Sequence, residues 1–471
     1  MDSAAFQSLT HTVLGAAFVV SALFGAIAHR THFCTMGAVS DIVNMGDWTR
    51  MRMWIMAIGV AMVGFHGMAA LGWIDPTQTI YYSGRVIWLS ALVGGALFGF
   101  GMVLGSGCGS KTLVRIGGGS LKSVVVFFVM GVAAFATLRG ITAVLRDRTV
   151  DRVAFEMQPG SPLSLWLAAH LGWSATAALW IGVGVGFALI VWAAWDDGVR
   201  RSSQAWLAGL GIGATVVAMW WVTGHLGFVP EHPETLEPVF VATNSGRMEA
   251  LTFTAPMAYT LDWLIYFSDQ NKVLSLGVVS VLGVVAGALA HALATRTFRW
   301  EGFAGTRDTA LHLVGALCMG VGGVTAMGCT IGQGLSGVST LSVTSVVAFA
   351  GILLGAVAGL RLQLWLQARQ WIWLRVRLRI QRPHRLGLQL RLRLRFRLRF
   401  SPENPAPTVR EAGGSGEREA GAGRRGTARD AAGGARDAAG GREGAARHAA
   451  GGGPGRGFGK HREGPGPGRR R

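Results

Sequence analysis

Long apolar stretches alternate with short polar segments along the first 360 residues. Nine stretches are apolar enough to cross a bilayer, for which about 20 residues are needed. Several are shorter than a full span, which is typical of helices that end inside the protein. The pattern predicts an all-α polytopic membrane protein with about nine transmembrane helices and short re-entrant half-helices. The predicted spans are residues 12–29, 53–71, 86–104, 123–138, 174–195, 205–223, 274–295, 311–327 and 341–360.

Two of these stretches end in similar glycine-rich elements built around a cysteine. The sequence reads GMVLGSGCGSKTL around Cys108 and GGVTAMGCTIGQGL around Cys329. The similarity continues into LKSVVVF at Leu121 and VTSVVAF at Val343, at an offset of 221–222 residues. Because the chain holds only four cysteines, the matched pair predicts an internal repeat. A second echo, GAIAH at Gly25 and GALAH at Gly287, has a different spacing and would run in the same direction in both copies.

Loop charges predict how the chain crosses the membrane. Arg30, Arg50 and Arg52 follow the first stretch, while the segment before it holds no Lys or Arg. The positive-inside rule then places the N-terminus outside and the C-terminus inside. The loop at 139–173 disagrees, because it would carry four arginines on the outside. In this topology the two Gly-Cys elements enter from opposite faces, as expected of a pseudo-symmetric inverted repeat.

Composition supports the membrane class and explains the high net charge. Half of the 471 residues are hydrophobic, 15% are charged, and 70 are glycine, which allows membrane helices to approach closely. Residues 361–471 hold 26 of the 44 Lys+Arg and 8 of the 25 Asp+Glu, a net +18 of the total +19. The basic character therefore belongs to the tail, and the core gives no reason to expect nucleic-acid binding.

The composition also divides the chain into three predicted parts. Residues 1–365 form the transmembrane domain, and residues 366–400 form a basic segment in which Leu and Arg alternate. That segment could lie on an anionic membrane surface. Residues 401–471 are rich in Gly, Ala and Arg and are expected to be disordered. The same composition also resembles a GC-rich gene read out of frame, so both origins of the tail stay open.

The Gly-Cys elements predict a site for a soft anion. Glycine permits tight turns and exposes N–H groups, and thiols add weak S–H donors. Alternatively, the glycines and cysteines simply pack between helices, which is the favoured interpretation for Cys318. A third thiol, Cys34, precedes a segment to Gly46 that could form a half-helix. Lys111 either attracts an anion or marks the cytoplasmic side. The candidate pathway residues are Cys34, Cys108, Cys329, Gly107, Gly109, Gly328, Gly332 and Lys111.

The cysteine motifs carry a family resemblance. RTHFCTMGAVSD, GSGCGSKTLVRIGGGS and AMGCTIGQGLSG together resemble the YeeE/YedE family of sulfur-transport membrane proteins, over roughly residues 12–365. The resemblance implies a bacterial inner-membrane protein with an hourglass-like fold that takes up thiosulfate. It also implies that Cys34, Cys108 and Cys329 contact the anion at a constriction, and that a cytoplasmic sulfur-carrier protein could be a partner.

These observations predict a transporter for thiosulfate or a related sulfur anion, without cofactor, metal or enzymatic activity. The alternative is a membrane thiol oxidoreductase or sulfurtransferase with a cysteine nucleophile, although the chain has no C-x-x-C motif. A soft-metal permease with thiolate ligands ranks last, because few Met or His residues flank the cysteines.

Overall fold

The computed structural model describes residues 3–233, 235–269 and 273–369. The chain divides into two units, residues 1–391 and 392–471, and every described residue belongs to the first unit. The predictions for the basic segment and the tail therefore lie outside the described residues, apart from 366–369, which continue the last helix.

Nine helical segments in the described part of the chain are long and apolar enough to cross a membrane. Each overlaps a span predicted from the sequence, so the all-α polytopic class is confirmed. The first segment joins α1 (Ser3–Thr31) to α2 (Thr35–Met45), and the third joins α4 (Trp88–Leu104) to α5 (Gly109–Gly117). The others are α3 (Thr49–Ala70), α6 (Leu121–Arg139), α9 (Ala175–Ala194), the segment Ser203–Leu226, α14 (Leu276–Ala294), α15 (Thr306–Thr325) and the last helix, Val343–Arg369.

Shorter elements connect these helices. Ser203–Leu226 contains α11 (Ser203–Trp206), α12 (Ile212–Trp221) and two π-helical stretches, η3 (Leu207–Gly211) and η4 (Val222–Leu226). The remaining helices are α7 (Ile141–Arg148), α8 (Leu163–Leu171), α10 (Asp197–Arg200) and α13 (Thr254–Ile265), with η1 (Pro76–Gln78), η2 (Val150–Arg152) and η5 (Gly332–Gly337). Two small antiparallel sheets pair β1 (Arg85–Val86) with β2 (Phe155–Glu156), and β3 (Phe228–Val229) with β4 (Val239–Phe240).

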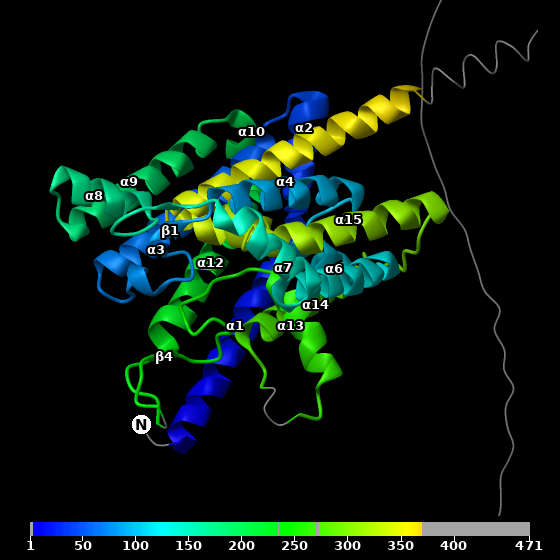
Figure 1. Ribbon diagram of the computed structural model, residues 1–471. Coiled ribbons are helices and arrows are strands. Elements are labelled where there is room, and N and C mark those ends of the chain that lie inside the picture. The colour runs from blue at the N-terminus through cyan, green and yellow to red at the C-terminus, as the bar shows by residue number, and fades with distance from the viewer. Residues whose placement is uncertain (1–2, 234, 270–272, 370–471) are drawn as a thin grey trace, which may run out of the picture. The chain divides into compact units, whose positions relative to one another are not determined.

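Glycines let α1 and α14 pack closely side by side (Figure 1). A Cβ added at Gly283 would lie 2.8 Å from the Phe18 backbone oxygen, and one added at Gly287 would lie 1.8 Å from the Ala22 oxygen. Contacts thus advance along both helices together, so α1 and α14 run parallel. The echo between GAIAH and GALAH therefore marks two neighbouring helices that run in the same direction, as the sequence suggested.

The helices α4 and α15 instead run antiparallel. Gly94, near the start of α4, packs against Gly322 and Ala326 at the end of α15, whereas Gly101 and Gly105 pack against Gly315. The last helix also lies against α4 (Figure 1), where Gly99 faces the Ile352 carbonyl. The helices before Cys108 and Cys329 therefore approach from opposite directions, which is the predicted inverted arrangement.

We expect Gly287→Ala to lower the free energy of unfolding in detergent by about 1–3 kcal/mol, because the new methyl group would overlap the α1 backbone. Thermal unfolding of the purified protein would measure the change. Gly15→Ala, on the same helix pair, is the matched control, because its Cβ would meet open space. Equal melting temperatures for the two variants would contradict the close contact.

Candidate functional site

Three cysteines occupy the same position in three copies of one turn. A long helix ends, one residue adopts the left-handed conformation, and the cysteine follows two residues later. The left-handed residues are His32, Ser106 and Met327, with φ of 52°, 56° and 59°. The next N–H reaches back five residues, from Phe33 to Ala28 (3.2 Å), from Gly107 to Met102 (2.8 Å) and from Gly328 to Gly323 (2.7 Å). This is the Schellman motif, which satisfies carbonyl groups at a helix end.

Each of these cysteines also starts a short helix. Cys34 and Cys108 are the N-cap residues of α2 and α5, and Cys329 precedes a short helix at residues 330–339. The N–H of Gly332 donates to Cys329 Sγ at 3.4 Å. The Gly37 and Lys111 N–H groups lie beside the sulfurs of Cys34 and Cys108 in the same way, three residues further along the chain. The predicted half-helix after Cys34 is thus confirmed as α2.

The three thiols come together although they are far apart in the sequence. The side chains of Cys34 and Cys108 are close neighbours, and Cys108 also lies near the Thr330 side chain beside Cys329. Cys108 Sγ lies 3.2 Å from Ser110 Oγ. Cys108 and Cys329 are 1% and 0% exposed, whereas Cys34 is half-buried. The thiols therefore form one group at the junction of three short helices, which we call the thiol cluster.

A fourth short helix, α13, completes the junction without a cysteine. Its N-cap is Phe253, whose N–H lies beside Cys329 Sγ and whose ring packs 5.5 Å from that of Phe24. Sequence reasoning missed this element because it searched for cysteines. A signal for a helix start was nevertheless present, since the α13 sequence has Pro256 in its first turn, where proline is tolerated.

The geometry concentrates partial positive charge at the thiol cluster. The N-terminus of a helix carries roughly half a positive charge and unpaired N–H groups. Four short helices have their N-termini at this junction: α2, α5, α13 and the 330–339 helix. Because α4 and α15 are antiparallel and end in the same turn, α5 and the 330–339 helix leave the junction in opposite directions. Such a site can stabilise an anion between two halves of the protein.

The change of repeat offset from 221 to 222 residues has a structural cause. The turn residues Ser106 and Met327 and the two cysteines differ by 221. Beyond the short helices, left-handed Gly119 and Leu341 differ by 222. Between these points α5 is α-helical, whereas Gly332–Gly337 is π-helical, and a π-bulge accommodates one inserted residue. The insertion widens the second short helix directly after Cys329.

A group of basic side chains lies beside Cys34 and Cys108. Lys111, in the first turn of α5, lies within electrostatic reach of both thiols. Arg115 and Arg50 surround it, and Arg50 forms an ion pair of 3.2 Å with Asp41. We call Arg50, Lys111, Arg115 and the exposed His32 the basic cluster. It lies at the end of α4 that carries the Cys108 turn.

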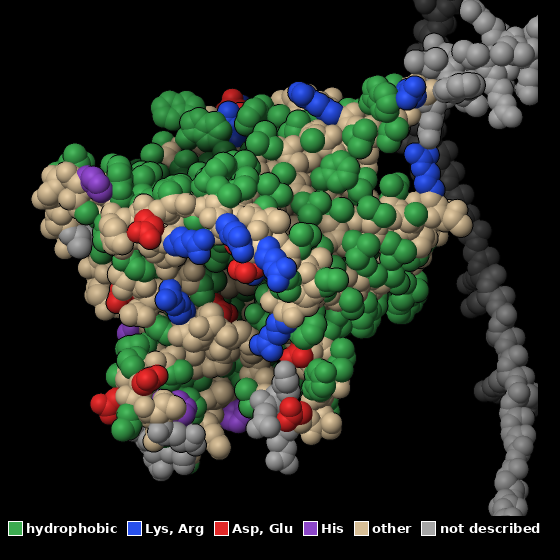
Figure 2. Space-filling view, viewed as in Figure 1, with side chains coloured by type: hydrophobic (Ala, Val, Ile, Leu, Met, Phe, Trp, Pro, Cys, Tyr) green, Lys and Arg blue, Asp and Glu red, His purple; other side chains and the backbone are tan. Residues whose placement is uncertain are grey.

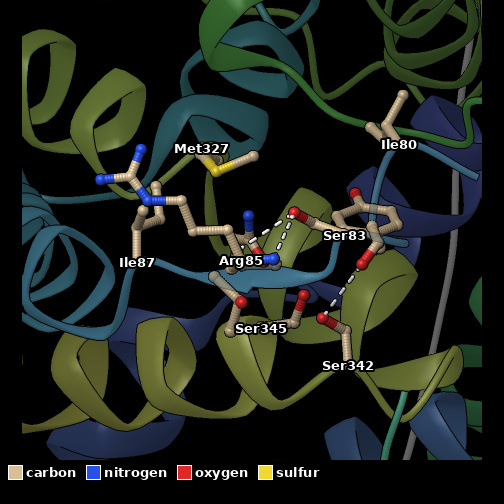
Figure 3. Close-up of a pocket in the computed structure, with 10 residues that line it drawn as sticks. Ile80, Ser83, Arg85, Ile87, Met327, Ser342 and Ser345 are labelled. Carbon is tan, nitrogen blue, oxygen red and sulfur yellow. Dashed lines mark hydrogen bonds between the residues drawn. The ribbon is translucent and has the colours of Figure 1, made fainter. Parts of the chain in front are cut away.

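A cavity of about 160 Å³ is lined by Ile87, the N-cap residue at the other end of α4, and by Met327, two residues before Cys329 (Figure 3). The hydroxyl of Tyr81 donates to the Gly332 carbonyl at 2.6 Å and forms one wall. Gln333 Oε1 and Ser345 Oγ are buried without a hydrogen-bond partner among the described residues. The cavity therefore has polar groups available to a guest. It is lined by Ile80, Tyr81, Ser83, Arg85, Ile87, Met327, Gln333, Ser342, Thr344 and Ser345.

Arginines gather around this side of the molecule. Figure 2 shows Lys and Arg side chains around a hollow between the regions that Figure 1 labels β1 and α7. Arg85, on β1, donates to the Asp151 carbonyl at 2.8 Å, and Arg146, on α7, pairs with the Asp151 carboxylate at 2.9 Å. Exposed Arg247 donates to the Tyr82 carbonyl at 3.1 Å. Arg146, one of the arginines that disagreed with the topology rule, is thus linked through Asp151 to Arg85, which lines the cavity.

The four predicted glycines shape the turns that hold the thiols. The N–H groups of Gly107 and Gly328 donate to main-chain carbonyls, and that of Gly332 donates to Cys329. Gly109 packs near the methyl groups of Met130 and Met257. Any role of these glycines in contacting a passing anion stays a prediction.

The remaining thiol, Cys318, lies apart from the others. It is half-buried within α15 and faces the Gly101 region of α4. All four cysteines are free. In the described ranges, three or more His, Cys, Asp or Glu side chains nowhere gather in an arrangement that could hold a metal ion.

The fold and the junction define the class: a polytopic membrane protein with an inverted pair of broken-helix elements. The family model described as "Sulphur transport" matches residues 30–358. The chain therefore belongs to the sulphur transport family, as its motifs predicted.

Three relatives place the chain among transporters by similarity. The thiosulfate transporter TsuA of Escherichia coli K12 is 26% identical over 67% of this chain and 85% of its own length. The TsuA of Spirochaeta thermophila is 26% identical over 72% of this chain and 95% of its own length. The probable transporter YedE of E. coli K12 is 27% identical over 24% of this chain and 26% of its own length.

We expect a short bifunctional thiol reagent to join Cys34 to Cys108 in a Cys318→Ala/Cys329→Ala variant, because the two side chains are close neighbours. Mass spectrometry of the peptides would detect the bridge. The control is Cys34→Ala/Cys108→Ala, which leaves Cys318 and Cys329. Their helix alone separates them by about 10 Å before the turn, at 1.5 Å per residue. Bridging of equal yield in both variants would refute the thiol cluster.

Proposed function

We propose that this protein is a membrane transporter that takes up thiosulfate through the thiol cluster. One observation carries the proposal: three thiols, each at the N-terminus of a short helix, meet between two inverted halves. The names of the TsuA relatives, which cover most of this chain, support the same substrate.

The chemistry of the junction suits a small dianion that carries a terminal sulfur. Burying such an anion costs free energy unless its atoms meet hydrogen-bond donors. Helix N-termini and hydroxyl groups suit its oxygens, and thiols make weak contacts with its sulfur. Conduction needs several binding positions, none of which binds the anion too tightly for it to move on. The cavity, the thiol cluster and the basic cluster would provide three such positions in order.

The proposed pathway has a direction. With the N-terminus outside, the cavity near Cys329 is the entrance, and the basic cluster near Lys111 faces the cytoplasm of a bacterial inner membrane. Arg146, linked through Asp151 to Arg85 of the cavity, would then lie beside the entrance, where its charge would attract an anion. The cytoplasmic sulfur carrier stays a prediction.

A thiol oxidoreductase or sulfurtransferase is the competing function. The contact between Cys34 and Cys108 would suit a redox pair, but the TsuA relatives are named as transporters. Serine variants separate the two functions, because a hydroxyl can still donate a hydrogen bond but cannot exchange disulfides.

We expect Cys108→Ala and Cys329→Ala each to reduce uptake of radiolabelled thiosulfate into proteoliposomes by about tenfold or more. This corresponds to about 1.4 kcal/mol of lost interaction along the pathway. The serine variants should retain more uptake than the alanine variants. The matched control is Cys318→Ala, which removes a thiol outside the cluster and should transport normally. Undiminished uptake in both alanine variants would overturn the thiol role.

We also expect Lys111→Met to raise the KM for thiosulfate by about tenfold, because the basic cluster loses its charge nearest both thiols. Lys111→Arg should restore much of the affinity, since it keeps the charge. Initial uptake rates over a range of concentrations would measure KM. If Lys111→Met behaves as the parent protein does, Lys111 serves only as a topology marker.

A further inference from the structure

Two histidines meet next to the basic cluster and take no part in the pathway described above. His29, in the last turns of α1, places its Nδ1 atom 3.0 Å from the Nδ1 of His291, near the end of α14. The two rings lie 5.1 Å apart between centroids. The close parallel packing of α1 and α14 holds them together, and both come from the echoed motifs GAIAH and GALAH. We call them the histidine pair.

The geometry of the histidine pair limits its charge. In a bond between two Nδ1 atoms, one ring donates a proton and the other accepts it with a lone pair. The pair can therefore be neutral or carry one extra proton with a net charge of +1. Two imidazolium rings would both be donors at Nδ1 and would repel each other. Histidine is the side chain that ordinarily serves as a proton-dependent switch in proteins. The contact is thus a built-in position for a single proton.

The surroundings of the pair are positively charged. Lys111 and His32 are within electrostatic reach of His29, and Arg50 within reach of His32. The end of α5 is also adjacent, since a Cβ at Gly118 would lie 3.5 Å from His29 Nε2. These groups place the pair in a positive electrostatic field when no anion is bound.

Few carboxylates on the packed elements offset this charge. Asp41 on α2 is paired with Arg50. Glu301, in the loop between α14 and α15, places its carboxylate 3.9 Å from Lys122 Nζ on α6. The α12 and η3 sequences, which pack on α1, contain no ionisable residue. Asp262 lies in the last turn of α13, near the loop that leads into the N-terminus of α14. His291 lies near the C-terminus of α14, at the opposite end of that helix. Arg30 follows His29 on α1, Arg115 lies near Lys111, and the Arg299 N–H donates to the carbonyl of Gly118 next to His29, so these residues add positive charge.

We propose that the histidine pair is a proton-binding site linked to an anion-binding site at the basic cluster. When a divalent sulfur oxyanion such as thiosulfate occupies the basic cluster, the pair takes up one proton from water, and it releases that proton when the anion leaves. This inference rests on the proposed function. Half-buried His29, His291 and Lys111 lie beside exposed His32, so water can supply the proton.

Linkage gives the sign of the effect. A proton on the pair attracts the anion, and the anion attracts the proton by the same factor. Thiosulfate itself does not change charge near neutral pH. Its affinity should therefore be highest where the pair can be protonated and should fall as pH rises. Coupling of this kind commonly changes affinity by about fivefold or more.

The test is equilibrium binding of radiolabelled thiosulfate to the purified full-length protein between pH 6 and pH 8, with proton uptake measured in weak buffer. We expect close to one proton taken up per anion and therefore about 100-fold tighter binding at pH 6 than at pH 8, because one linked proton changes the affinity tenfold per pH unit. In His29→Asn/His291→Asn, the amides can keep a hydrogen bond between the helices but cannot titrate. Binding should persist there, with its pH dependence and proton uptake lost.

Two controls locate the proton. His170→Asn changes an exposed histidine on α8 whose Nδ1 contacts the Trp166 carbonyl, and it should behave as the parent protein does. His225→Asn changes a second exposed histidine, whose Nδ1 contacts the Trp73 carbonyl, and it should also keep the proton uptake. If the His29→Asn/His291→Asn variant binds thiosulfate and retains the proton uptake, the proposal is overturned.

Different results would contradict the proposed function and the role of the histidine pair. If the parent protein neither binds nor transports thiosulfate, the proposed function fails. If it transports thiosulfate, but binding is independent of pH and takes up no proton, only the role of the histidine pair fails. That measurement needs no variant, so it decides the matter even if the double variant does not fold.

Discussion

The structure depends on satisfying backbone groups where helices break at membrane depth. Lipid offers no hydrogen bonds to an exposed N–H or C=O, so a broken helix needs partners within the protein. Here one turn meets that need three times, with a left-handed residue and a long back-reaching bond, after α1, α4 and α15. The same turn delivers a cysteine to the start of a short helix. The turn that satisfies the backbone groups is therefore also the turn that positions each thiol of the site.

Close helix packing makes that feature possible. The turns coincide only because α4 approaches α15 and the last helix at glycine and alanine positions, and because α1 approaches α14 in the same way. Between membrane helices, such contacts depend on van der Waals packing more than on the hydrophobic effect. A methyl group at Gly287 or Gly99 would separate helices whose ends carry the thiols or the histidine pair. The position of the thiols therefore depends on the glycines that let these helices pack closely.

The two sides of the junction differ in charge chemistry. Arginines held by Asp151 and by backbone carbonyls border the cavity side, whereas Lys111 and three histidines lie beyond Cys108. Arginine keeps its charge at every physiological pH, but histidine does not. An anion would therefore meet a constant positive field on one side and a proton-dependent field on the other.

Much of the architecture could be predicted from the sequence. All nine spans, the half-helix after Cys34 and the opposed approach to Cys108 and Cys329 were anticipated, because apolar length and motif repetition are local properties. The fourth short helix at Phe253 escaped notice because it lacks a cysteine. The π-helix after Cys329 was visible only as an offset that changed by one residue.

The sequence by itself determined which segments enter the membrane, where helices break and which residues stand at those breaks. Only the tertiary structure decided that Cys34 lies against Cys108, that Thr330 joins them and that His29 faces His291. Hydrophobic runs and turn signals act over a few residues, so they can be read along the chain. The partners of a thiol or an imidazole depend on how distant helices pack, and that packing is set by many contacts at once.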